Sequence, residues 1–355
     1  MRSVRLLLIT LLVVAGLVAC HRGHEEGGRQ PLSGRPPRIG FSMDSLQLER
    51  WHHDRDEFIA RARQLHAEVF VQSANAVDAV QVRQCENLLT LGVDVLVIVP
   101  HNGEVMASVV NSAKAQGVPV ISYDRLIRNS DVDLYVSFDN RRIGELQAKY
   151  LYERAPAGNY ILLGGAPTDN NAHLIREGQL DVLRPGLESG AIHIVADQWA
   201  RDWLASEAMR HTENALTQAN NNVVAVVASN DSTAGGVVQA LEEQKLAGKV
   251  LVSGQDADLA AVQRVAEGKQ SMTIYKPIQP LAAKAAEAAV LLAYGKSVAT
   301  NGTVNNGKRD VPSILLQPIV IDRTNLGSTV IKDGFLKRED IYRNLPREQW
   351  PEVKE

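Results

Sequence analysis

From Arg38 onward, short runs rich in β-branched residues alternate with longer stretches of helical periodicity, and this alternation constrains the fold more than any other feature. Strands separated by helices in this way form βαβ units with a parallel sheet. The runs at 93–100 and 223–229 are almost continuously apolar, as expected for strands that are covered on both faces. Ten strands are predicted, at 38–44, 68–74, 93–100, 118–124, 134–140, 159–165, 192–199, 223–231, 249–256 and 272–277.

The number of strands and the length of the chain both predict two lobes. Ten strands exceed the roughly 5–6 of an average sheet, so two sheets are expected rather than one. The chain has 355 residues, and a single hydrophobic core usually stops growing beyond about 250–300 residues. The tail from Thr303 lacks the repeat and is expected to add edge segments. Helices are predicted at 52–65, 78–91, 104–116, 141–154, 202–218, 232–245 and 278–294.

The first nineteen residues have the features of an export signal. Arg2 and Arg5 precede a 14-residue apolar run that ends at Ala19, which is shorter than the roughly 17–25 residues that span a bilayer. A charged start, an apolar run and small residues before a break are typical of a signal peptide, here residues 1–19. The residues Leu-Val-Ala-Cys at 17–20 resemble a bacterial lipobox, so we expect Cys20 to carry lipid as the first mature residue. An ordinary signal peptide or a signal anchor is the alternative.

Residues 20–37, which begin with the lipidated Cys20, are predicted to form a flexible tether, because Gly, Pro and charged residues dominate them. Removal of residues 1–19 takes away two of the 38 basic and none of the 41 acidic residues, which leaves a formal charge of -5. This balance argues against a nucleic-acid partner, because such proteins normally concentrate basic residues on one face. With Cys20 acylated, Cys85 has no disulfide partner and is expected to be a buried or half-buried thiol.

Polar residues follow most of the predicted strands. In open α/β sheets ligands bind beyond the carboxyl ends of the strands, so these residues indicate a cleft to which both halves of the chain contribute. Asp, Asn and Arg can engage two neighbouring hydroxyls at once, and Trp offers an apolar face to a ring. The set favours a neutral polyol such as a sugar, although for each Asp or Asn alone helix N-capping is an equal explanation. The positions are Asp44, 100–102, 124–125, 139–140, 168–171, 197–199, 230–231, 255–256 and 275–276.

The motifs of common enzyme classes are missing from the sequence. No GxGxxG follows a strand, and no P-loop, HExxH, CxxC or GxSxG is present. Two cysteines cannot form a four-ligand zinc site, and His52, His53 and Asp56 are better explained by a solvated helix face than by a metal. The sequence therefore predicts that the protein is not an enzyme and binds no cofactor and no metal. Carboxylate pairs such as Asp256 and Asp258 leave a sugar-active enzyme as an alternative.

Long motifs between residues 38 and 336 carry a resemblance to a known family. They are LERWHHDRDEF, AEVFVQSAN, GVDVLVIVPHNG, ISYDRLI, YVSFDNRRIGELQAKYL, GGAPTDNNAHLIREGQ, DQWARDWL, VVASNDSTAGG, VSGQDADLA, TIYKPI and NNGKRDVPSILL. These motifs resemble those of the D-xylose-binding type I periplasmic binding proteins of bacterial ABC transporters. The resemblance implies an α/β fold of two Rossmann-like lobes with parallel sheets and a three-segment hinge. We expect 38–140 and 277–305 in the N-terminal lobe, and 141–276 and 306–345 in the C-terminal lobe.

The resemblance also implies, motif by motif, which residues contact the sugar. The expected contacts are Arg50, Trp51, Asp124, Arg125, Arg176, Trp199, Asn230, Asp256 and Lys276, with Asn170, Asn171 and His101 as secondary candidates. His101 departs from the family pattern, in which an aromatic residue is usual at this turn, and the pair His52-His53 departs as well. These departures bear on affinity or on the rim of the site rather than on the class of sugar.

The function implied by the resemblance is that of a substrate-binding lipoprotein of an ABC sugar importer. Such a protein closes its lobes over D-xylose, or a close aldopentose, and delivers it to a membrane permease and its ATPase. It is expected to be an exported monomer, periplasmic or at the cell surface, held at a membrane through Cys20. The alternatives are a receptor for another monosaccharide and a sugar sensor that signals to a chemoreceptor or sensor kinase. A sugar-responsive DNA-binding regulator would need a helix-turn-helix where this chain has its leader and tether.

Overall fold

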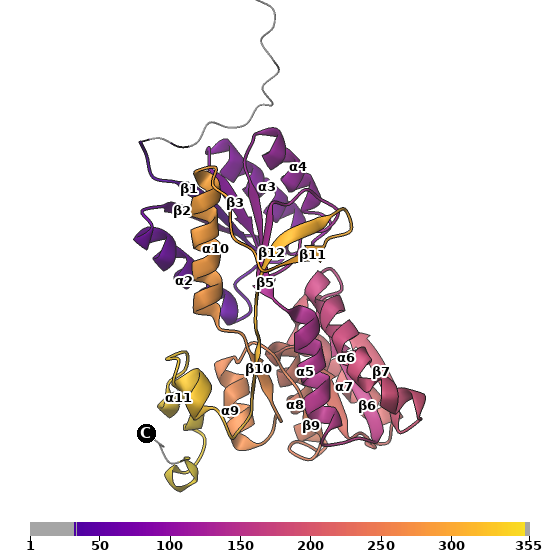
Figure 1. Ribbon diagram of the computed structural model, residues 1–355. Coiled ribbons are helices and arrows are strands. Elements are labelled where there is room, and N and C mark those ends of the chain that lie inside the picture. The colour runs from indigo at the N-terminus through magenta and orange to yellow at the C-terminus, as the bar shows by residue number, and fades with distance from the viewer. Residues whose placement is uncertain (1–31, 33, 352–355) are drawn as a thin grey trace, which may run out of the picture.

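The computed structural model describes residue 32 and residues 34–351, and the chain forms two α/β lobes joined by a narrow neck (Figure 1). The predicted signal peptide, Cys20 and most of the predicted tether lie outside the described residues. Arg35, near the end of that tether, binds the N-terminal lobe, with its Nη1 2.8 Å from Oδ2 of Asp94. Within the described part of the chain, every helix is too short or too polar to cross a membrane.

The N-terminal lobe is built on a seven-stranded sheet in the order β11-β12-β5-β4-β3-β1-β2, in which only the β11–β12 pair is antiparallel. Its strands are β1 (Arg38–Met43), β2 (Glu68–Ser73), β3 (Val95–Ile98), β4 (Val120–Tyr123), β5 (Leu134–Phe138), β11 (Gly302–Asn305) and β12 (Asp310–Leu316). Its helices are α2 (Arg50–Gln64), α3 (Asp78–Thr90), α4 (Ala107–Ala115) and α10 (Ile278–Ala293).

Strand β3 shows why the N-terminal sheet needs helices on both faces. Val95 and Val97 pack in the core that α2 and α10 cover, whereas Leu96 and Ile98 pack in the core that α3 and α4 cover. Successive residues of a strand point to opposite faces, so a wholly apolar strand is stable only when both faces are buried. The prediction of doubly covered parallel strands is therefore confirmed.

The C-terminal lobe carries a parallel four-stranded sheet, β7-β6-β8-β9, and a separate antiparallel pair, β10-β13. Its strands are β6 (Gly158–Gly164), β7 (Ile192–Trp199), β8 (Ala225–Ala228), β9 (Leu251–Val252), β10 (Thr273–Tyr275) and β13 (Ile319–Ile321). Its helices are α5 (Asn140–Tyr152), α6 (Asn170–Glu188), α7 (Ala205–Gln218), α8 (Asp231–Glu243), α9 (Leu259–Glu267) and α11 (Arg338–Tyr342). A short 3-10 turn at Arg201–Trp203 precedes α7.

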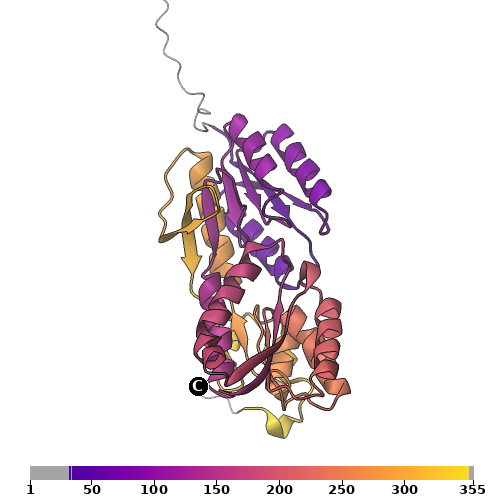
Figure 2. The same ribbon diagram turned by 90° about the vertical axis from the view of Figure 1, so that its right-hand side faces the viewer.

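The chain passes between the lobes after β5, after β10 and after β12, as the three-segment hinge requires (Figures 1 and 2). One lobe boundary differs from the prediction. Strand β12 pairs in parallel with β5, and Leu316 lies opposite Phe138. Residues 306–316, predicted to lie in the C-terminal lobe, therefore belong to the N-terminal lobe. The reason is that the β11–β12 hairpin completes the sheet edge that β5 would otherwise leave open.

Candidate functional site

A small cavity lies between the lobes, at the carboxyl ends of strands from both sheets; about 270 Å³ of empty space, part of it open to solvent, surrounds it. The lining comes from the start of α2, the end of β4, the start of α6 and the segments that follow β7, β8, β9 and β10. This is the position at which parallel α/β sheets bind ligands. The lining residues are Leu48, Arg50, Trp51, Asp124, Arg125, Asp169, Asn171, Trp203, Asn230, Gln255, Asp256 and Lys276.

Four buried charges bridge the two lobes across this cavity. Arg50 of the N-terminal lobe lies with Nη2 2.8 Å from Oδ2 of Asp124 in its own lobe, and with Nη1 3.1 Å from Oδ1 of Asp256 in the other. Lys276 of the C-terminal lobe lies with Nζ 3.1 Å from the same Asp256 oxygen and 3.5 Å from Oδ2 of Asp124. Burial favours a higher pKa for Asp124, but the charges of Arg50, Lys276 and Arg125 outweigh it and hold the pKa below its usual range. Two anions and two cations therefore face each other where the lobes meet.

Behind Arg50, Asp54 holds the guanidinium in place. The Arg50 Nε donates to Asp54 Oδ2 at 3.1 Å, and the Tyr123 hydroxyl donates to Asp54 Oδ1 at 2.5 Å. Asp54 is completely buried, and burial raises its pKa despite the neighbouring Arg50. Asp54 follows Arg50 by four residues on α2, one helical turn away. The i, i+4 spacing of Arg50 and Asp54 is the sequence signal that indicates this support.

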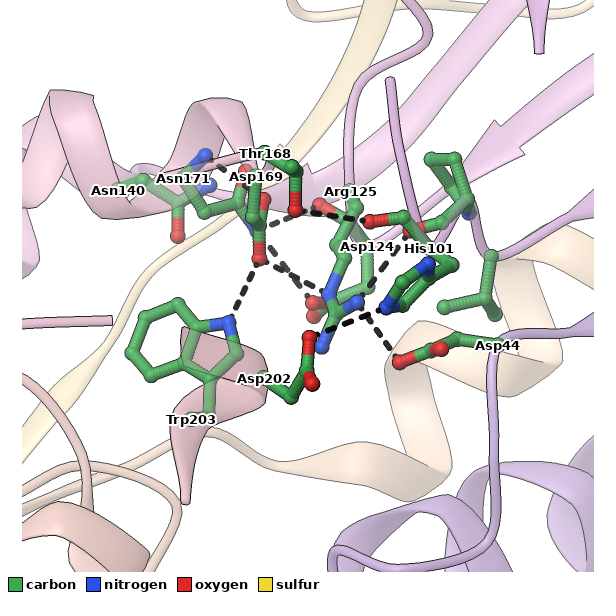
Figure 3. Close-up of polar contacts among 12 residues, drawn as sticks. Asp44, His101, Asp124, Arg125, Asn140, Thr168, Asp169, Asn171, Asp202 and Trp203 are labelled. Atoms are coloured by element: carbon green, nitrogen blue, oxygen red, sulfur yellow. Dashed lines mark hydrogen bonds and ion pairs between the residues drawn. The ribbon is translucent and has the colours of Figure 1, made fainter. Parts of the chain in front are cut away.

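Arg125 forms a second bridge between the lobes (Figure 3). Its Nη1 donates to Oδ2 of Asp44 in the same lobe at 2.8 Å, and its Nε lies 2.9 Å from Oδ2 of Asp169 in the other lobe. The same Asp169 oxygen accepts from the indole Nε1 of Trp203 at 3.2 Å. Asn171 donates through Nδ2 to the backbone oxygen of Asp124 at 3.0 Å. Asp169 was noted among the strand-end residues but was not predicted to line the site.

Trp51 and Trp203 supply the indole rings of the lining. Trp203 fits there because the neighbouring residue is Gly165: a Cβ at that position would lie 2.3 Å from three atoms of the indole ring. Asp202 and Trp203 both have positive φ, 53° and 58°, which L residues seldom adopt. No residue type near Trp203 predicts this turn, so the sequence alone gives Trp203 no role in the site.

Three buried polar atoms of the lining have no hydrogen-bond partner among the described residues: Asp124 Oδ2, which is ion-paired with Arg50 and Lys276, and Trp51 Nε1 and Gln255 Oε1. Buried polar groups in proteins are nearly always paired, so an orphaned donor and an orphaned acceptor in one cavity suit a ligand that carries hydroxyl groups. Gln255 is a candidate contact that the sequence analysis placed at a strand end without assigning it to the site.

The structure brings together most of the residues expected from the motifs, but not all of them. Arg176 pairs with Asp197, and its guanidinium lies 4.9 Å from the ring centre of Trp199, which in turn contacts the His173 ring. Neither Arg176 nor Trp199 lines the cavity. Arg176 lies nearly two turns into α6, on a face that packs against β7, and β7 is the edge strand of its sheet. The expectation that these two side chains reach the ligand therefore stays a prediction, and the turn after β7 brings Trp203 to the cavity.

Asn170 and His101 also lie outside the lining, at the rim where the lobes meet. Asn170 Oδ1 accepts from Nη1 of Arg128 in the other lobe at 3.1 Å. His101 contacts Asp202 of the other lobe, with Nε2 3.2 Å from Oδ1. Both secondary candidates thus connect the lobes rather than face the cavity.

Across residues 32 and 34–351, no group of three or more His, Cys, Asp or Glu side chains is placed to hold a metal ion. Cys85 is a buried free thiol, as expected, and burial raises its pKa to about 12.

Known proteins share this architecture and much of this sequence. A family model described as a periplasmic binding protein domain matches residues 39–297. The D-xylose-binding periplasmic protein of Haemophilus influenzae is 55% identical over 305 residues, which cover 86% of this chain and 92% of that protein. Its counterpart in Escherichia coli strain K12 is 54% identical over 304 residues, with the same coverage of 86% and 92%. A solved carbohydrate transporter solute binding protein from Chloroflexus aurantiacus, in complex with D-glucose, has a TM-score of 0.81 and 32% identity, and the match covers 86% of this chain and 98% of that one.

Proposed function

The chain belongs to the periplasmic binding protein family, and on that basis we propose that it binds D-xylose, or a close aldopentose, in the cavity between its lobes. The observation that carries this proposal is the pairing of buried charges from both lobes around one cavity: Arg50 and Asp124 from one side, Asp256 and Lys276 from the other. A pyranose presents hydroxyls around its ring, and each hydroxyl can accept from a cation and donate to a carboxylate. The protein is a solute receptor and not an enzyme.

The same geometry explains how a sugar would hold the lobes together. A hydroxyl that accepts from Arg50 and donates to Asp256 is bound by both lobes, whereas in an open form it keeps only one of these partners. A ligand shifts a conformational equilibrium by its differential affinity for the two states, so the closed form is favoured. Each well-made charge-assisted hydrogen bond contributes about 1.5–3 kcal/mol. Trp51 and Trp203 cover the apolar C–H surface of the ring.

The protein is exported and periplasmic, like the relatives whose names place them there. We further infer that the closed receptor delivers its sugar to the permease and ATPase of an ABC importer, that it works as a monomer, and that lipid on Cys20 anchors it to a membrane. The lipobox at 17–20 supports the anchor. Mass spectrometry of the mature N-terminus tests it, since an unmodified Cys20 would refute the anchoring.

A second candidate function is a receptor for another monosaccharide. The observation that favours it is the relative from Chloroflexus aurantiacus, which is 32% identical and carries D-glucose. A hexose is therefore a necessary member of any sugar panel.

Calorimetric titration with D-xylose, D-ribose, L-arabinose, D-glucose and D-galactose tests the proposal. D-xylose should bind most tightly. Heat of binding with glucose or ribose, but none with xylose, would refute the proposal. Lys276→Met removes one buried charge of the cavity and should weaken binding by about 10- to 150-fold, the equivalent of 1.5–3 kcal/mol. Lys284→Met removes an exposed lysine from α10 and is the matched control, for which Kd should stay unchanged.

A further inference from the structure

His101 lies at the rim of the cleft between acidic residues of both lobes (Figure 3). It follows β3 in the N-terminal lobe, and its Nδ1 lies 2.6 Å from Oδ1 of Asp78, the first residue of α3 in the same lobe. On the other side of the ring, Nε2 lies 3.2 Å from Oδ1 of Asp202, in the turn before α7 of the C-terminal lobe. The His101 side chain is 13% exposed, so water competes little for these contacts.

The two contacts together determine the protonation state of the His101 ring. An ionised carboxylate only accepts hydrogen bonds, and a neutral imidazole carries one N–H and one lone pair. With a neutral ring, one nitrogen lone pair would therefore face a carboxylate oxygen. Both contacts are hydrogen bonds only when both ring nitrogens carry protons. The conformation with the lobes in contact thus selects the imidazolium form of His101.

The net effect of the other groups around His101 favours the same form. Asp44, at the end of β1, adds a third negative charge, although Arg125 pairs with it. Arg201 lies 3.9 Å from the other oxygen of Asp202 and is 73% exposed. Burial lowers the pKa of His101, but the contacts with Asp78, Asp44 and Asp202 outweigh it, so that the net pKa is raised.

The other neighbours of His101 are neutral. The side chain of Gln81 on α3 accepts from the His101 backbone N–H at 2.9 Å, and the Thr168 hydroxyl, from the C-terminal lobe, lies 3.4 Å from the His101 backbone oxygen. Glu104 on the same loop is exposed. The acidic residues next to the ring therefore decide its protonation.

We propose that His101 is a proton-operated latch. In its protonated form it joins Asp78 of one lobe to Asp202 of the other, and so keeps the neighbouring Trp203 ring in place as part of the lining of the closed cleft. Asp202 and Trp203 are consecutive residues of one left-handed turn, so a bond to Asp202 also fixes the indole next to it. The latch rests on the proposed function, because it is sugar that brings the lobes together. When the lobes separate, His101 keeps Asp78 and loses Asp202, and its affinity for the proton falls.

Because of this latch, the protein takes up protons when it binds sugar. The contribution of the latch to affinity is fully present below the pKa that His101 has in the open form, and is lost as pH rises through the higher pKa of the closed form. In that range Kd for the sugar should increase with pH, by at most about tenfold per pH unit for one proton. A tether, a lipid anchor or a permease is not needed for this effect.

The test is calorimetric titration with D-xylose between pH 6 and 9, in two buffers with different heats of ionisation, which reports the protons taken up per sugar bound. The wild type should take up a fraction of a proton near neutral pH. His101→Gln and Asp202→Asn should lose that uptake, and their Kd should depend less on pH. His193→Gln, which removes an exposed histidine from β7, should behave like the wild type.

The outcomes separate the latch from the proposed function. Burial and neighbouring carboxylates, among them Glu49 of the opposite lobe, raise the pKa of Asp258; Asp258 is unchanged in every variant, so the difference between variants reports His101. Tight sugar binding with equal proton uptake in the wild type and in His101→Gln would overturn the latch alone. An absence of binding to any sugar at any pH would refute the proposed function, and with it the coupling of the latch to sugar.

Discussion

Two adjacent glycines offer a sharp test of which tryptophan the sugar touches. A Cβ at Gly165 would lie 2.3 Å from the ring of Trp203, and a Cβ at Gly164 would lie equally close, 2.3 Å, to the ring of Trp199. Both glycines have ordinary negative-φ backbones, so alanine is acceptable to the chain itself. Gly165→Ala and Gly164→Ala thus each press a methyl group against one indole ring, and of the two rings only that of Trp203 lines the cavity.

The expected magnitudes follow from the displacement. Ordinary contact begins near 3.4 Å, so the Trp203 ring has to move by about 1 Å in Gly165→Ala. A shift of that size stretches the 3.2 Å hydrogen bond from Trp203 Nε1 to Asp169 beyond hydrogen-bond range. It also moves the ring from its position in the cavity lining. We expect a loss of about 1–3 kcal/mol in sugar binding, or roughly 5- to 150-fold in Kd.

The assay is calorimetric titration with D-xylose, together with thermal unfolding of both variants. Crowding should destabilise both by a similar amount, on the order of 1–3 kcal/mol. Gly164→Ala should nevertheless keep the wild-type Kd. The reasoning would be refuted if Gly164→Ala weakened binding while folded Gly165→Ala did not, because Trp199 would then be the wall that the motifs indicated.

Three further predictions concern buried groups. Asp54→Ala leaves the buried Arg50 without its supporting carboxylate, so the free energy of unfolding should fall by about 3–5 kcal/mol in urea titrations. The control is Asp56→Ala, which removes an exposed carboxylate and should change the free energy of unfolding by less than about 1 kcal/mol. Burial raises the pKa of Asp231 to about 7, so the folded state binds this proton more tightly than the unfolded state. Stability should therefore fall as pH rises from about 4 to 7, and Asp231→Asn should flatten that slope; a slope unchanged in the variant would contradict the assignment. The third prediction uses a chain that begins at Gly34, in which Cys85 is the one cysteine. Its thiol should stay unreactive toward a thiol reagent at pH 8 until the protein unfolds, because burial raises the pKa of Cys85 to about 12.

The parts of the site that sequence reasoning predicted are those that local sequence determines. Asp124, Asn230, Asp256 and Lys276 each follow a short apolar strand, and the carboxyl end of such a strand has a known place in an α/β sheet. The existence of the strands was equally accessible, because their apolar runs are bounded by helical patterns.

The parts that were missed depend on contacts between distant segments. Trp203 reaches the cavity through two successive left-handed residues, neither of which is glycine, and no residue type in that turn reveals such a backbone. Trp199 lies only four residues away and matched a motif, but it ends an edge strand. The place of β12 depends on an open sheet edge at β5, some 170 residues earlier in the chain.

The late return of the chain to the N-terminal lobe has a consequence for how the protein can be made. Helix α10 covers one face of β1, β3, β4 and β5, and β12 closes the edge next to β5, yet both follow the entire parallel sheet of the C-terminal lobe in the sequence. A growing chain can therefore form the parallel sheet of its second lobe while the apolar face of its first lobe is still uncovered. Contacts of such long range slow folding and prolong the exposure of aggregation-prone surface. The lobe whose synthesis begins first therefore waits for α10 and β12 before its sheet is covered and its edge is closed.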